Sequence, residues 1–77
     1  MKKLELNYAN INFNNRLCGE LKNGQYIMTS EIEKIFFNES HKNEIIIFTQ
    51  NSIYHLTDLD DDNFSNIAYG YKQIINV

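Results

Sequence analysis

Cysteine, proline, tryptophan and glycine are nearly missing from this chain of 77 residues, which contains one cysteine, no proline, no tryptophan and three glycines. The lone cysteine excludes an internal disulfide, and with no basic-then-apolar leader it predicts a cytoplasmic protein. No apolar run approaches the roughly 20 residues that span a bilayer, so we expect no membrane partner. A chain this short buries only about 60–65% of its unfolded surface, which predicts a single domain over residues 1–77.

Positive charge is also scarce. Residues 1–24 contain four cations against two carboxylates, residues 25–77 contain three lysines against eight carboxylates, and the whole chain carries a net charge of −3. Duplex binding requires clustered cations that displace condensed counterions, so direct nucleic-acid binding is disfavoured. A degenerate nucleic-acid-binding module would have to use the four cations of the first segment, Lys2, Lys3, Arg16 and Lys22.

Five residue types are abundant instead. Asparagine, isoleucine, lysine, tyrosine and phenylalanine account for 39 of the 77 residues. All five have A/T-rich codons, which indicates an AT-rich genome rather than a specialised asparagine tract. The composition is typical of a low-GC bacterium or of one of its phages or plasmids.

No set of residues has the spacing of a catalytic or metal site. Asp58, Asp60 and Asp62 are spaced like the first ligands of an EF-hand calcium loop, but Asn63 and Tyr69 replace its glycine and its bidentate glutamate. The cysteine and the two histidines lack metal-ligand spacing, and the dispersed glycines form no phosphate-binding loop. We therefore expect a protein that is not an enzyme and that holds no cofactor or metal.

The first part of the chain predicts three strands. Apolar and polar residues alternate from Leu4 to Phe13, and a change of phase at residues 9–10 indicates a bulge or bend. Residues 17–22 predict a second strand and residues 25–29 a third. Asn23 and Gly24 between them predict a hairpin, because both residues tolerate the positive φ of a type I′ turn.

Residues 30–37 fit two interpretations. Ser30 and Glu33 have the spacing of a capping box, after which Ile32, Ile35 and Phe36 would line one face of a two-turn helix. Alternatively, residues 26–37 form one long strand. The local signal favours the helical turn slightly, whereas the strands on both sides favour the strand.

The next apolar run, at residues 45–48, is continuous rather than alternating, which is typical of a strand covered on both faces. Residues 53–56 predict its hairpin partner. The C-terminal segment predicts a helix capped by Thr57 or Asp58, although Gly70 leaves a strand through residues 67–71 as an alternative. Its apolar residues follow helical spacing: Phe64, Ile67, Ala68, Tyr71, Ile74 and Ile75.

These elements predict an α+β fold, with a small, mainly antiparallel sheet of about 4–5 strands and a C-terminal helix packed on one face. The helix can shield only one side of the sheet, whereas residues 45–48 present apolar side chains to both sides. We therefore expect the second side to meet another polypeptide, either a second copy or a different protein.

The function predicted from these observations is a small acidic protein-binding module. By analogy with anti-CRISPR proteins as a class, it would be an inhibitor from a phage or mobile element, and its partner would be a host protein with a basic surface. The alternatives are a homo-oligomeric structural or regulatory subunit, such as a homodimer, and the nucleic-acid module. The predicted contact residues are four aspartates, two glutamates and the best exposed tyrosine: Asp58, Asp60, Asp61, Asp62, Glu31, Glu33 and Tyr69.

Overall fold

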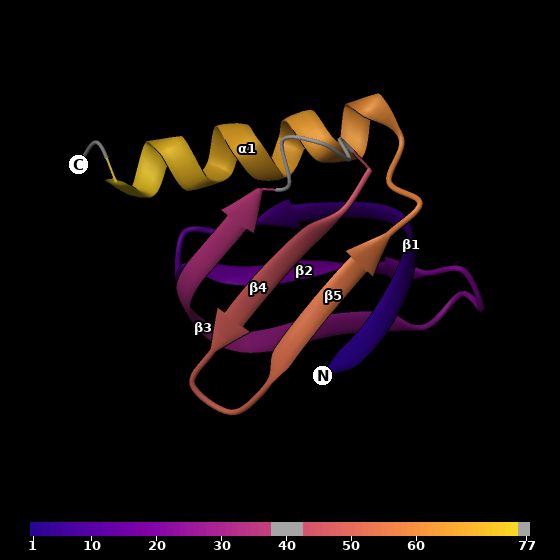
Figure 1. The fold of residues 1–77 in the computed structure, drawn as a ribbon, viewed down its shortest axis with the longest axis horizontal. Helices are drawn as coiled ribbons and strands as arrows, with labels where there is room; N and C mark the ends of the chain where they lie inside the picture. The colour runs from indigo at the N-terminus through magenta and orange to yellow at the C-terminus, as the bar shows by residue number, and fades with distance from the viewer. Residues whose placement is uncertain (38–42, 76–77) are drawn as a thin grey trace.

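The structure, a computed structural model, describes residues 1–37 and 43–75. This part of the chain forms five strands followed by one helix (Figure 1). The elements are β1 (Lys2–Ile11), β2 (Arg16–Leu21), β3 (Tyr26–Phe37), β4 (Ile45–Thr49), β5 (Ile53–Thr57) and α1 (Asp61–Ile75).

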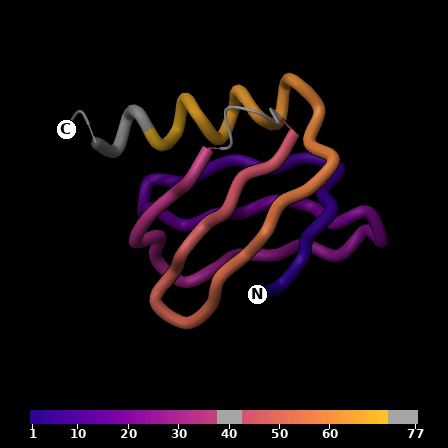
Figure 2. Tube along the Cα trace, in the orientation of Figure 1, coloured from indigo at the N-terminus to yellow at the C-terminus, as the bar shows by residue number. Residues whose placement is uncertain are grey.

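The five strands form a closed barrel in sequence order. Each strand pairs antiparallel with the next, and a parallel pairing of residues 2–5 of β1 with β5 closes the circle (Figure 2). Both long strands change neighbours along their length. Residues 6–11 of β1 pair with β2, whereas β3 pairs first with β2 and then, from residue 32, with β4. The mainly antiparallel α+β fold is therefore confirmed.

The irregularity of β1 lies earlier than predicted, between Leu6 and Tyr8 rather than at residues 9–10. The side chain of Asn63, in the first turn of α1, fixes the backbone there. Its Nδ2 donates to the Asn7 carbonyl at 3.0 Å, and its Oδ1 accepts from the Ala9 N–H at 3.1 Å. One buried amide therefore joins the helix to the irregular strand.

The hairpin at Asn23 and Gly24 is present, but its geometry differs from a type I′ turn. Gly24 has φ of 90°, whereas Asn23 is not among the described residues with positive φ. The Gly24 N–H donates to the Leu21 carbonyl, and the Leu21 N–H donates to the Gln25 carbonyl. This pattern is a three-residue turn whose last residue alone needs the left-handed conformation.

Residues 30–37 are strand, so the helical interpretation was wrong and the long-strand alternative is confirmed. The pairing of β3 with β4 shifts register between Ile32 and Lys34, which makes Glu33 an extra residue in the strand. Because of this bulge, Ile32 and Ile35 are both buried while the two residues between them are exposed. Apolar residues three positions apart suggest a helix, but here they result from a strand with one inserted residue.

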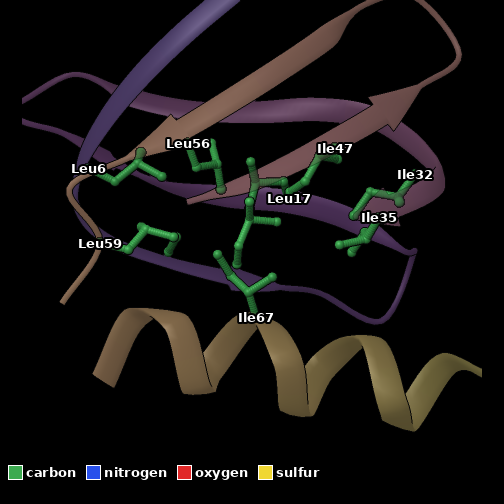
Figure 3. Close-up of a cluster of buried hydrophobic side chains, with 10 residues drawn as sticks. Leu6, Leu17, Ile32, Ile35, Ile47, Leu56, Leu59 and Ile67 are labelled. Carbon is green, nitrogen blue, oxygen red and sulfur yellow. The ribbon is translucent and has the colours of Figure 1, made fainter. Parts of the chain in front are cut away.

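The C-terminal segment is a helix, as predicted, but its cap is Asp60 rather than Thr57 or Asp58. The Asp60 Oδ1 accepts a hydrogen bond of 2.7 Å from the Asn63 N–H, as an N-cap carboxylate does at the third helical position. Ile67 points from α1 into the barrel and is fully buried (Figure 3).

The helix thus closes one end of the barrel and packs mainly on β1 (Figure 1). A Cβ on Gly70 would lie 3.0 Å from the Cβ of Ile11, so the missing side chain allows the close approach. Two tyrosines, Tyr54 and Tyr71, are partly buried against the core. Among the residues whose burial is described, the core consists of ten apolar side chains: Leu6, Ala9, Leu17, Ile32, Ile35, Ile45, Ile47, Leu56, Leu59 and Ile67.

Candidate functional site

The predicted acidic residues at 58–62 lie where β5 leads into α1. Leu59 is buried in the core, and the aspartates on both sides of it are exposed. Asp58 has φ of 55°, a left-handed conformation that aspartate tolerates better than most residues. The carboxylate of Asp60 caps the helix, which leaves Asp58, Asp61 and Asp62 as the aspartates that could contact a partner.

The exposed side of α1 joins these acids to the predicted tyrosine. Tyr69 is 68% exposed, and it follows Asp62 by seven residues, about two helical turns or roughly 10 Å along the axis. Residues at this spacing lie on the same side of a helix. We name this surface the acidic helix face; it consists of Asp61, Asp62, Ser65, Asn66 and Tyr69, all exposed.

Negative charge dominates the chain around the acidic helix face. Residues 43–77 contain five carboxylates and one lysine, Lys72, which follows Tyr69 by three residues. The first-turn acids also interact favourably with the helix dipole, which explains their position even without a partner. The helix dipole therefore accounts for the position of these acids, and the same acids can also contact a partner.

The two predicted glutamates do not join this face. The Glu31 carbonyl accepts a hydrogen bond from the N–H of Gln50, in the turn between β4 and β5, whereas Asp58 follows the opposite end of β5. Glu33 is the bulge residue of β3. Both side chains are exposed, but the barrel separates Glu31 from the aspartates by the length of a strand.

A second exposed surface lies outside β3, β4 and β5. Ile45 and Ile47 point into the barrel and are fully buried, so Ile46 and Phe48 point outward, where they are half-buried. Ile46 pairs with Phe36, and the pairing of Phe48 with Ile53 adds a fourth apolar side chain. The Phe36 and Phe48 rings pack edge to face with centroids 5.6 Å apart. We name this surface, Phe36, Ile46, Phe48 and Ile53, the phenylalanine face.

A third exposed surface covers β2. Tyr8 on β1 and Tyr26 on β3 are both paired with Glu20, and their rings meet edge to face at 6.0 Å. The Tyr8 hydroxyl donates to the Tyr26 hydroxyl at 2.9 Å, and this bond is the main cause that raises the pKa of Tyr8 to about 12. Cys18 pairs with Met28 in the next row. We name this surface, Tyr8, Cys18, Tyr26 and Met28, the tyrosine face.

The cations proposed for a nucleic-acid module are divided between two places. Lys3 and Lys22 line one hollow of about 310 Å³, together with Glu5 and a partly apolar floor. Arg16 lies at the far end of β2 from Lys22, and its guanidinium donates to the Thr29 carbonyl at 3.3 Å. The structure therefore does not collect all four charges into one track for a phosphate backbone.

The residues considered for metal or nucleophilic chemistry also lie apart. The Cys18 thiol is half-buried and donates to the Asn10 side-chain oxygen at 2.8 Å. His55 is on the outside of β5, with its Nε2 3.7 Å from the Glu44 carboxylate. His41 lies outside the described residues. Within residues 1–37 and 43–75, no cluster of three or more His, Cys, Asp or Glu side chains is placed to hold a metal.

Two findings concern the chain as a whole. No helix within the described ranges is long and apolar enough to cross a membrane. Comparisons with protein families, with curated proteins and with solved structures find no match to the chain. A functional argument therefore depends on the surfaces that its own residues form.

The phenylalanine face was predicted only in part. The continuous run at residues 45–48 indicated apolar side chains on two sides of a strand, and Ile46 and Phe48 bear this out. The sequence left Phe36 open between a two-turn helix and a long strand, and it placed Ile53 on a strand without saying which side the residue faces. Neither residue was therefore predicted as an exposed contact residue. The register of β3 against β4, which determines where Phe36 points, depends on the bulge at Glu33.

Proposed function

We propose that this chain is a non-enzymatic protein-binding module that uses the acidic helix face to bind a basic surface of another protein. The supporting observation is the segment of residues 43–77, which has five carboxylates against one lysine and which places two exposed aspartates on the same side of α1 as an exposed tyrosine.

Charge and aromatic contact would contribute differently. Opposite charges accelerate encounter and fix orientation more than they add affinity, because exposed ion pairs are weak. Tyrosine is enriched among the residues that dominate binding energy, because it buries a large rigid surface and keeps a polar end. Asp61 and Asp62 would therefore orient the partner, and Tyr69 would anchor it.

The finer form of the proposal is an inhibitor from a phage or mobile element. A small acidic module that covers a basic, nucleic-acid-binding surface of a host protein would block that surface without chemistry of its own. The AT-rich composition and the excess of carboxylates over basic residues in the second part of the chain support this form. Anti-CRISPR proteins act in this way as a class.

The test compares two variants with the same change of charge. Asp61→Ser with Asp62→Ser removes two carboxylates from the acidic helix face and keeps the Asp60 cap, whereas Glu31→Ser with Glu33→Ser removes two from β3. Immobilised protein is incubated with lysate of a low-GC host, and bound proteins are quantified by mass spectrometry from about 50 to about 300 mM salt.

The expected result is a basic protein that the wild type and the β3 variant retain at low salt and that the helix variant loses. Tyr69→Ser should also lose it, but with little change in the salt dependence. Equal loss with the β3 variant, or equal retention by all the variants, would contradict the proposal.

A further inference from the structure

The phenylalanine face is not covered by any of the described elements, and its central strand, β4, is apolar on both sides. The inner side of β4 is sealed within the barrel, where Ile45 and Ile47 are fully buried. In Figure 1 α1 lies across one end of the barrel, and no described element is drawn over the outer side of β4 and β5. Phe36 is 47% exposed and Ile53 is 39% exposed.

The arrangement of these side chains suits a protein contact. The face is formed by three adjacent strands, with Phe36 and Ile46 in one row and Phe48 and Ile53 in the next. Buried aromatic and aliphatic groups at the centre of a patch, surrounded by polar groups, are the usual anatomy of an interface. Contiguous apolar patches of this kind mark interaction sites more often than scattered apolar residues do.

The charges around the face distinguish between partners. Glu33 and Lys34 are exposed on β3, and the Lys34 ammonium lies 4.6 Å from the centroid of the Phe36 ring. On the other side, Lys3 pairs with His55, whose imidazole approaches Glu44. Among the described residues, two carboxylates and two lysines thus lie beside the apolar centre, and their formal charges cancel.

This balance disfavours a strongly charged occupant. A basic partner, as proposed for the acidic helix face, would face two lysines here, and an acidic partner would face two carboxylates. A second copy of the same face supplies both signs and an apolar centre of the same size. Isologous dimers need such self-complementary patches, because the same surface is used by both subunits.

We infer that the phenylalanine face is the interface between two copies of this chain. The dimer would cover Ile46 and Phe48 with their equivalents from the second copy, and it would leave both acidic helix faces free for other partners. A small domain with a limited core also gains stability from such an association. The inference goes beyond the proposed function, and neither depends on the other.

The first measurement is the molar mass in solution by light scattering at micromolar concentration. We expect twice the chain mass of 9.1 kDa for the wild type and for the Asp61→Ser, Asp62→Ser variant. The combination of Phe36→Ser with Phe48→Ser should give a single-chain mass with an unchanged circular dichroism spectrum. Lys34→Glu, which leaves the core intact, should shift the equilibrium toward the monomer because it upsets the charge balance.

The second measurement locates the contact by cross-linking. On a Cys18→Ser background, Ile46→Cys should form a disulfide-linked dimer under mild oxidation, and Tyr26→Cys, an equally outward position on the tyrosine face, should not. A wild type of single-chain mass at every soluble concentration would overturn the inference. Equal cross-linking by both cysteines, or a monomeric helix-face variant, would also overturn it.

Discussion

The tyrosine face and the phenylalanine face both expose aromatic rings on strands of one barrel, yet their rings are in different chemical situations. Tyr8 and Tyr26 hydrogen-bond to one another across β2 and keep hydroxyl groups in contact with water. Phe36 and Phe48 pack edge to face, but they have no polar atom that gains from exposure. Exposed aromatic area by itself is therefore a poor guide to a binding surface. A phenol can hydrogen-bond at an exposed surface, whereas a phenyl ring has no polar group that water can solvate.

The strand β3 explains how one barrel has two such different exteriors. Its first half pairs with β2 and contributes Tyr26 to the tyrosine face. The bulge at Glu33 then changes the register, and the second half contributes Phe36 to the phenylalanine face. The three predictions below test the difference between these surfaces and the packing beneath them.

The largest effect is expected just inside the phenylalanine face. Ile47→Ala should lower the free energy of unfolding by about 2–5 kcal/mol, because it removes a fully buried side chain and leaves a cavity. Ile46→Ala, one residue away on the outer side, should cost about 1 kcal/mol or less in the monomer. Urea denaturation of both variants, followed by circular dichroism, measures the difference.

Protein concentration provides the control for this pair. If copies associate through the phenylalanine face, the cost of Ile46→Ala should grow as the concentration rises, whereas that of Ile47→Ala should change much less. Similar costs for the two variants at low concentration would mean that residues 45–48 do not alternate between inside and outside. The barrel geometry of β4 would then be wrong.

The sequence contained enough information for the number of strands, the C-terminal helix and the hairpin at Gly24. Period-2 alternation, a continuous apolar run and helical spacing are local signals that persist in the fold. The bulge at Glu33 is different, because it exists only through the pairing of β3 with β4, and without it residues 32 and 35 suggest a helix. The closure of the sheet by β1 and β5 is likewise a long-range pairing with no local signal.

The candidate site also combines features that local sequence signals predict with features that depend on the three-dimensional fold. The exposure of Tyr69 and the acids at the start of the helix were predictable from helical spacing and composition. The cap at Asp60 was not, because it depends on Leu59 entering the core and fixing where the first turn begins. The separation of Glu31 from the aspartates also required the three-dimensional path of the strands.

The second prediction concerns the packing beneath the tyrosine face. Gly19 lies opposite Ala9 in the β1–β2 pairing, and a Cβ there would collide with the Tyr8 carbonyl oxygen. Gly19→Ala should therefore destabilise the fold by about 1–3 kcal/mol, since the backbone of β1 must move to admit a methyl group. Thermal unfolding measures the cost, and Gly24→Ala, which meets no neighbour but requires φ of 90°, is the matched control at about 1 kcal/mol.

Movement of β1 should also disturb the tyrosine pair, because the colliding oxygen belongs to Tyr8 itself. The near-ultraviolet circular dichroism of Gly19→Ala should therefore change, whereas that of Gly24→Ala should not. A Gly19→Ala protein with wild-type stability would show that β1 and β2 are farther apart than the structure places them.

The smallest effect is a pH dependence specific to the tyrosine face. The hydrogen bond to Tyr26 favours the protonated form of Tyr8 and raises its pKa from 10.0 to about 12. Because the pKa of the folded state lies above that of the unfolded chain, the stabilisation is fully present below about pH 10 and is lost as the pH rises toward 12. Tyr26→Phe removes the main cause, so the Tyr8 pKa should fall toward its ordinary value and the alkaline loss of stability should become shallower.

Ultraviolet absorbance of tyrosinate, recorded against pH, measures this change. The difference between the wild type and Tyr8→Phe isolates the Tyr8 titration, and the same difference on the Tyr26→Phe background shows it without its partner. Tyr69→Phe is the control, because Tyr69 is exposed on α1 and outside the pair. An unchanged Tyr8 midpoint after Tyr26→Phe would mean that the two hydroxyls do not bond in solution. The contrast between hydrogen-bonded phenols and phenyl rings without polar atoms would then lose its basis.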